Sequence, residues 1–110
     1  MTKLIDLAVE HFNSLGVREV IIPEWGDTKV FMKNFSLEDK AKLSARAQED
    51  TWDYLCYTVI FGLVDGEGNA VFDIGDKVKL KRFSASGIVE RLATEILAHQ
   101  SETEEERKKN

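Results

Sequence analysis

The stretch "VIIPEWGDTKVFMKNFSLEDK", residues 20–40, carries the strongest local structural signals in the chain. Two runs of β-branched and aromatic residues, 17–22 and 29–35, flank a connection that contains a proline, a glycine and an aspartate. Such runs on either side of turn-forming residues are typical of a β-hairpin. The stretch therefore predicts a hairpin in the N-terminal half of the chain.

A helical region is predicted directly after this hairpin. Ser36 and Asp39 have the spacing of a capping box, in which the serine side chain accepts from a first-turn amide. The helical pattern runs to about residue 64, with a break near "AQEDT" (47–51). Its second half, 50–64, is the most apolar part of the chain, so we expect a central core helix there.

Two further helices are predicted near the ends of the chain. Residues 3–15 place their apolar side chains at spacings of three and four, which favours one helical face. A later helix begins at Ser84 or Ser86, carries an apolar stripe and ends near residue 99. The final segment, 101–110, contains no apolar residue, and we expect it to be a disordered charged tail.

These elements predict an α+β fold: a small, mainly helical domain of residues 1–100 with a β-hairpin in its N-terminal half and a disordered charged tail. Residues 73–83 fit either a short helix that starts at Asp73 or an alternating strand. The side chains expected in the core are Trp52, Leu55, Val59, Ile60, Leu92 and Ile96.

Composition limits the classes of partner. The chain has 110 residues, with 15 basic and 20 acidic side chains and a net charge of −5. A nucleic-acid binder needs a basic face that displaces counterions from phosphate, so no nucleic-acid partner is expected. The sequence holds no apolar run near the ~18 residues of a membrane span and no secretory signal pattern, so we expect a cytoplasmic protein without a membrane partner.

No set of residues predicts catalysis. Cys56 lies in an apolar run and is interpreted as a buried small hydrophobe. His11 and His99 fall on different predicted helices, in positions interpreted as solvated. The acidic segment 65–73 lacks the glycine and glutamate positions of a calcium loop. We therefore expect no enzyme activity, no cofactor and no metal site.

The turn tryptophan, Trp25, has two interpretations. It either folds back over the hairpin and covers its small core, or it is a rigid contact residue, because tryptophan is enriched at interface hot spots. Phe31, on the predicted second strand, is a second aromatic candidate for contact with a partner.

The segment "VIIPEWGDTKVFMKNFS" resembles a pattern near the start of tail assembly chaperones of long-tailed, siphovirus-type bacteriophages. The later order is also similar: a charged helix, an apolar helix that ends in "GLVDGEGNAVF", a short Asp-led segment, and "SASGIVERLATEIL" before a charged tail. The likeness covers about residues 17–110, and Lys33 stands where that family usually has arginine. This resemblance favours a helix over 73–83.

The resemblance implies a non-catalytic assembly factor. Such chaperones bind the tape measure protein, keep it soluble, promote assembly of tail-tube subunits, self-associate, act in the host cytoplasm and are absent from the mature virion. On this basis Trp25 and Phe31 are expected to contribute to self-association or partner binding. The alternative is a small structural virion protein, such as a head–tail connector or tail-completion subunit.

The C-terminal residues raise one further expectation. Many chaperones of this kind are made in two lengths by ribosomal frameshifting, and the codons of Lys108, Lys109 and Asn110 can form an A-rich slippery run. The longer product would then recruit the tail-tube protein through an added domain. The other interpretation is that the two lysines only increase solubility.

Overall fold

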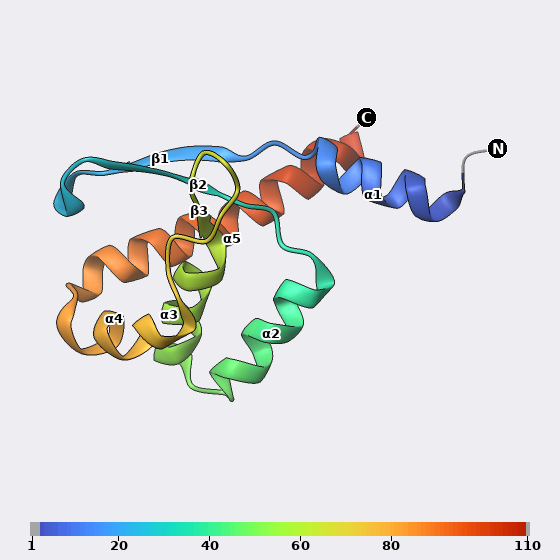
Figure 1. Cartoon of the computed structure of the whole chain (residues 1–110). Coiled ribbons are helices and arrows are strands. Elements are labelled where there is room, and N and C mark those ends of the chain that lie inside the picture. Colours follow the sequence, from blue (N-terminus) through green and yellow to red (C-terminus); the bar gives the residue numbers. More distant parts are fainter. Residues whose placement is uncertain (1–2, 110) are drawn as a thin grey trace.

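The structure is a computed structural model that describes residues 3–109, with side chains described for residues 3–100. Five helices, two short 3-10 helices and three strands follow one another along this part of the chain (Figure 1). In order they are α1 Leu4–Ser14, β1 Arg18–Ile22, η1 Pro23–Trp25, β2 Thr28–Met32, α2 Leu37–Ala47, α3 Thr51–Gly62, β3 Leu63–Val64, η2 Ile74–Asp76, α4 Lys77–Phe83 and α5 Ser86–Lys109.

The predicted hairpin is confirmed. Strands β1 and β2 pair antiparallel, with Val20 opposite Val30. The turn begins with Pro23, whose fixed φ suits the start of a 3-10 helix. It ends with Gly26 and Asp27 at φ values of 71° and 56°, in the left-handed region that glycine adopts without steric cost.

A third strand was not predicted from the sequence. β3 has two residues and pairs antiparallel with β2, which gives a sheet of order β1-β2-β3. Leu63 and Val64 directly continue the apolar run of α3, so the sequence pattern gives no sign of the change from helix to strand. A single bridge from Val64 to Ala70 then places the extended segment after the 65–69 turn beside the sheet.

The break between α2 and α3 falls where the sequence predicts it. Gln48 and Glu49 both have positive φ, which ends α2. Asp50 then caps α3, because its side chain accepts hydrogen bonds from the backbone N–H groups of Trp52 and Asp53. The chain therefore turns sharply between α2 and α3, and the two helices pack against each other (Figure 1).

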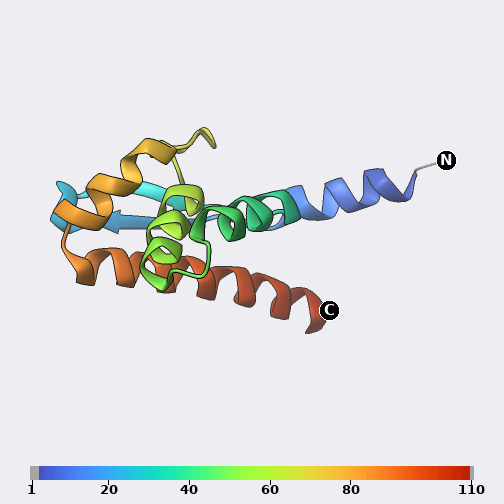
Figure 2. The ribbon, with the colours of Figure 1, turned by 90° about the horizontal axis from the view of Figure 1, so that it is seen from below.

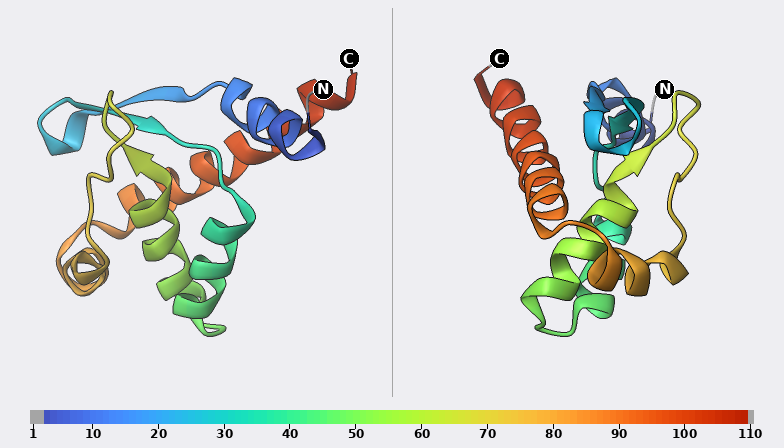
Figure 3. Two further views of the ribbon diagram at one scale, coloured as in Figure 1. Left: turned by 45° about the vertical axis from the view of Figure 1, so that its right-hand side comes forward. Right: turned by 90° about the vertical axis from the view of Figure 1, so that its left-hand side faces the viewer.

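Helix α3 lies at the centre of the fold, flanked by α2 and α4, while α5 crosses it obliquely (Figure 3). Close passage of α3 and α5 depends on Gly62, where an added Cβ would lie 2.7 Å from Cγ2 of Ile96. The buried cluster joins one face of the hairpin to all these helices. Its members are Ile22, Val30, Met32, Leu43, Cys56, Tyr57, Val59, Ile60, Leu63, Leu80, Val89, Leu92, Ala93 and Ile96.

The structure corrects three predictions about burial. Trp52 was predicted to be in the core, but it lies in the first turn of α3 and 60% of its surface is exposed. Leu55 is only partly buried at the edge of the core. His99 was interpreted as solvated, yet it is buried on the inner side of α5 with 7% exposure.

The segment 73–83 contains helix rather than strand, as the resemblance implied: Asp73 is the N-cap, and residues 74–83 form η2 and α4. Helix α5 runs to Lys109 instead of ending near residue 99, because the following segment is rich in glutamate and lysine, which favour helix. The side chains of 101–110, the segment predicted to be a disordered tail, lie outside the described residues, and its disorder in solution stays a prediction.

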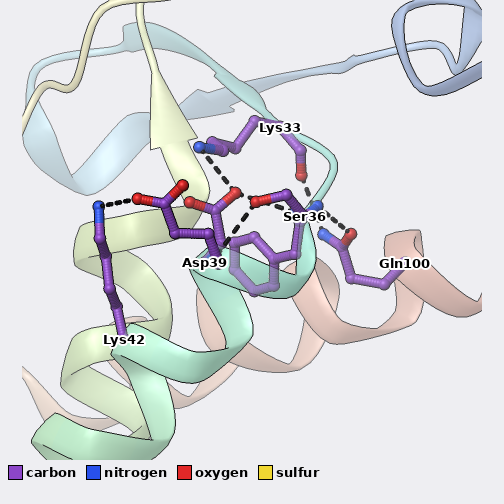
Figure 4. A network of polar contacts seen from close by, with 7 residues as sticks. Lys33, Ser36, Asp39, Lys42 and Gln100 are labelled. Atoms are coloured by element: carbon purple, nitrogen blue, oxygen red, sulfur yellow. Dashed lines mark hydrogen bonds and ion pairs between the residues drawn. The ribbon is translucent and has the colours of Figure 1, made fainter. Parts of the chain in front are cut away.

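A polar network fixes the start of α2 (Figure 4). The predicted capping box is present: the Asp39 backbone N–H donates to Ser36 Oγ at 3.1 Å, and the Ser36 N–H donates to Asp39 Oδ2 at 3.0 Å. Lys33 lies 3.1 Å from the same carboxylate oxygen. Partial burial acts to raise the pKa of Asp39, but the hydrogen bond from Ser36 and the Lys33 ammonium outweigh it and lower that pKa.

Gln100 connects this corner to α5. Its side-chain amide donates to the Lys33 carbonyl at 2.9 Å, and its carbonyl oxygen accepts from the Phe35 N–H at 2.8 Å (Figure 4). The amide therefore uses both its donor and its acceptor on the backbone that follows β2. These two hydrogen bonds fix the position of α5 at Gln100 relative to the sheet.

Candidate interaction surface

The Pro-Glu-Trp-Gly turn is anchored to the rest of the fold by an ion pair. Arg91 on α5 donates two hydrogen bonds to the Glu24 carboxylate, at 2.8 and 3.0 Å. Hydrogen bonding from the Arg91 guanidinium lowers the pKa of Glu24 to about 2. This bidentate hydrogen bonding fixes the orientation of the turn relative to α5.

The ring of Trp25, the residue after Glu24, packs on Phe72. The two ring centroids are 6.0 Å apart at an interplanar angle of 78°, an edge-to-face arrangement. Trp25 is half-buried at the edge of the core. Both sequence interpretations therefore describe part of its position: one side of the ring covers the core, and the other remains accessible.

A shallow groove lies between this turn and α4, and we call it the α4 groove. Its volume is about 400 Å³. Its aromatic lining consists of Trp25, Phe72 and Phe83, of which Phe83 is 81% exposed. The groove is lined by Trp25, Val71, Phe72, Asp76, Lys79, Leu80, Phe83 and Ser84.

Helix α4 is strongly basic, and its charges divide between two sides. Lys77 and Lys81 lie 3.1 and 2.7 Å from Oδ1 of Asp53, which ties α4 to α3. The hydrogen bond from Lys81 is the main cause of the lowered pKa of Asp53. Lys79 and Arg82 are exposed and have no ion pair within residues 3–100. Of these two cations, Lys79 lines the α4 groove, where Asp76 also lies.

Phe31, the second predicted contact residue, lies elsewhere. Side chains alternate along a strand, so Phe31 faces away from its buried neighbours Val30 and Met32. It is half-buried, paired in register with Glu19 and Val64 on the outer face of the sheet. The structure therefore does not bring Phe31 and Trp25 into one pocket.

A second pocket on the other side of α4 was missed from the sequence. It has a volume of about 220 Å³ and lies between α3, α4 and α5, with Trp52 on its rim. Its polar wall is formed by Lys81, Ser84 and Glu90. Periodicity could not identify Trp52 and Phe83 as surface residues. Each lies among apolar residues of its helix, and the packing of the neighbouring helices determines which of these residues face solvent.

Helix α1 provides a third apolar surface. It buries no residue and extends away from the body of the molecule (Figure 2). Leu4 and Ile5 are 82% and 65% exposed, and Leu7, Val9 and Phe12 are also accessible. Asn34 fixes only the base of this helix, where its side chain donates to the carbonyls of Leu15 and Gly16.

The described residues offer surfaces for binding and little for chemistry. No group of three His, Cys, Asp or Glu side chains within them could hold a metal ion. Cys56 is buried, as predicted, and desolvation raises the pKa of its thiol, which disfavours the reactive thiolate. None of the helices in the described part of the chain is long and apolar enough to cross a membrane.

Comparison with solved structures identifies a relative of this architecture. The structure of the bacteriophage HK97 tail assembly chaperone superposes with a TM-score of 0.65, over 86% of this chain and 90% of that chain, at 20% sequence identity. The chain has the fold of a phage tail assembly chaperone. No protein-family model and no curated protein sequence matches it. The fold predicted from the Pro-Glu-Trp-Gly resemblance is thus confirmed by a three-dimensional likeness.

Proposed function

We propose that this protein is a tail assembly chaperone that binds the tape measure protein of its phage and keeps it soluble. The observation that supports this most strongly is the fold shared with the HK97 chaperone over most of both chains. The proposed role is non-catalytic, and it needs accessible apolar surface rather than a reaction centre.

The surfaces of the chain suit a helical client. A tape measure protein is long and helical, and an amphipathic helix presents apolar side chains at regular intervals. The α4 groove and the Trp52 pocket are apolar, lie side by side on α4 and share Leu80 and Ser84. Several self-associated copies along one client would bind with avidity, although each single contact is small.

The experiment is co-purification. The chain carries an affinity tag and is expressed together with the tape measure protein of the same phage, and the eluate is examined for both proteins. The proposal predicts a stable complex with more than one copy of the chaperone on each client. Recovery of the tagged chain alone, while the client remains in the pellet, would contradict the proposal.

Recruitment of tail-tube subunits is the second part of the proposed role. We propose that a minor, longer product continues past residues 108–110 into a domain that binds the tube protein. The supporting feature is the sequence Lys108-Lys109-Asn110, whose codons can be written almost entirely with A. Synonymous recoding of the two lysines should abolish the long product, and a single product from the natural codons would exclude this mechanism.

The proposed place of action is the host cytoplasm, with the chaperone absent from the mature virion. Mass spectrometry of purified particles tests this directly. The chain is expected in infected-cell extracts but not in particles. Its detection in particles at a fixed copy number would favour the structural alternative, a connector or tail-completion subunit.

A further inference from the structure

We infer that helix α4 is a hinged flap, held closed over the Trp52 pocket by ion pairs to α3, and that it opens while the rest of the domain stays folded. Opening exposes apolar side chains of α3 and α5 that are buried in the closed form, so charge controls access to the pocket. The inference does not depend on the proposed client. It rests on three features: the small share of α4 in the core, the ion pairs that hold it, and the position of Cys56 beneath it.

Helix α4 contributes little to the core. It lies alongside α3 (Figure 1), and of its seven residues, all of which the structure describes, Leu80 alone is buried. A helix much shorter than about 12 residues is marginally stable by itself in water, so contacts with α3 and α5 determine where α4 lies. The segment that follows it, 84–85, has no regular secondary structure and forms a natural hinge.

The hydrogen bonds of this region close within the region itself. The Asp73 N–H donates to Asp76 Oδ2 at 2.8 Å, and the Ser84 hydroxyl donates to the Leu80 carbonyl at 2.6 Å. Among residues 3–100, no backbone group of 73–84 forms a hydrogen bond with another helix or with the sheet. Displacement of α4 therefore breaks no backbone hydrogen bond between elements of this part of the chain.

Ion pairs hold α4 against α3. Both Lys77 Nζ and Lys81 Nζ lie close to Oδ1 of Asp53, at 3.1 and 2.7 Å, and Lys81 Nζ is also 3.8 Å from Oδ2 of Asp50. The Lys77 ammonium lies 6.0 Å from the centre of the Tyr57 ring. The lysine and aspartate side chains remain between 18% and 44% exposed, so water and salt reach these pairs and weaken them.

Cys56 lies under the flap and reports on its position. It is the single cysteine of the sequence, it is 3% exposed, and it lines the Trp52 pocket together with Leu80 and Lys81. Burial raises the pKa of its thiol, Asp53 raises it further, and Lys77 and Lys81 lower it. Removal of the two lysine charges would by itself disfavour the reactive thiolate and slow modification of the thiol. Faster modification after their removal therefore reports opening and not electrostatics.

The test measures the rate at which N-ethylmaleimide, a neutral thiol reagent, modifies Cys56 in the whole folded chain at constant pH. In Lys77→Gln/Lys81→Gln the rate should rise about three- to tenfold, because two exposed ion pairs are lost. In the wild type, an increase of NaCl from about 10 mM to about 1 M should raise the rate about threefold through screening. The double variant should respond little to salt.

The matched control, Lys79→Gln/Arg82→Gln, removes two positive charges from the same helix. Neither Lys79 nor Arg82 has an ion pair within residues 3–100, so this variant should be modified at the wild-type rate. Low urea concentrations separate the flap from global unfolding, because a local opening exposes little surface and its rate depends weakly on urea.

Three results would overturn the inference. They are a rate for Lys77→Gln/Lys81→Gln that is no faster than the wild-type rate, a wild-type rate that does not change with salt, and a rate that rises with urea as steeply as global unfolding does. No client is present in this measurement, so its failure is distinct from failure to bind the tape measure protein.

Discussion

Arg91 on α5 holds Glu24 at the tip of the hairpin through two parallel hydrogen bonds, with Nη1–Oε2 and Nη2–Oε1 distances of 2.8 and 3.0 Å. The two residues are 67 positions apart in the sequence. This pair gives the Pro-Glu-Trp-Gly turn a structural explanation: the glutamate ties the turn to a helix, and the next residue, Trp25, packs on Phe72.

The Glu24–Arg91 pair predicts a pH-dependent contribution to stability. The pKa of Glu24 is lowered from 4.5 to about 2 in the folded chain, so the folded state favours the charged carboxylate. Its contribution is present above pH 4.5 and is lost as pH falls toward 2. Glu24→Gln should therefore lower Tm modestly at neutral pH, and the difference from wild type should shrink toward zero near pH 2.

The control for this measurement is Glu90→Gln. Glu90 is an exposed residue on α5, next to Arg91, and it has no ion pair within residues 3–100. It should leave Tm almost unchanged at neutral pH. Two results would show that the pair does not stabilise the turn. One is an equal Tm for Glu24→Gln and the wild type at neutral pH, and the other is a Tm difference that stays the same in acid.

Truncation of Leu92 should be costly, whereas truncation of Trp52 should not. Leu92 is fully buried between α5 and α3, so Leu92→Ala should cost about 2–5 kcal/mol of unfolding free energy. Trp52 is mostly exposed, and Trp52→Ala should cost less than about 1 kcal/mol. Urea denaturation of both variants gives the comparison, and the reverse order would contradict the described core.

The crossing of α3 and α5 should depend on Gly62. Alanine normally favours a helix, yet a Cβ at this position would meet the fully buried Ile96 side chain at 2.7 Å. Gly62→Ala should therefore destabilise by about 1–3 kcal/mol, and Ile96→Val in the same chain should reduce that cost.

Gly87→Ala is the matched control for Gly62→Ala, because it adds the same methyl group where no atom lies within 4 Å. This change should be neutral or stabilise by about 0.4–1 kcal/mol. Equal Tm changes for the two glycine variants would mean that the helices do not approach as closely as described.

Trp25→Ala should separate assembly from folding. The ring is only half-buried, so the variant is expected to remain folded with a reduced Tm while self-association or client binding is lost. Size-exclusion chromatography with circular dichroism reads both properties, and Phe31→Ala tests the other predicted contact residue. Leu37 is exposed on α2 and lines neither of the two pockets beside α4, so Leu37→Ala is the control for assembly. Simple unfolding of Trp25→Ala would assign the residue to the core alone.

Local signals in the sequence predicted much of this fold because short-range chemistry determines them. Ser36 and Asp39 are three residues apart and form the predicted capping box, and Pro23 and Gly26 mark the hairpin turn. Leu92 and Ile96 repeat at helical spacing and are fully buried. In each case the partners lie within one turn or on one face of a single element.

The features that were missed depend on contacts between distant segments. The α4 groove joins Trp25, Phe72 and Phe83, and no periodicity connects three aromatic residues so far apart. Trp52 and His99 were assigned to the wrong side of their helices, because the position of a neighbouring helix, and not the helix itself, determines which side is buried. Strand β3 is too short to have a pattern of its own.

The central claim is that this chain keeps a tape measure protein in solution, and the soluble fraction of that protein tests it most directly. The client from the same phage is expressed alone and with increasing amounts of the chain, and each lysate is separated by ultracentrifugation. The account predicts that the client is mostly pelleted when alone and becomes soluble in proportion to the chain. An unchanged pellet fraction, with the chain itself folded and soluble at every level, would contradict it.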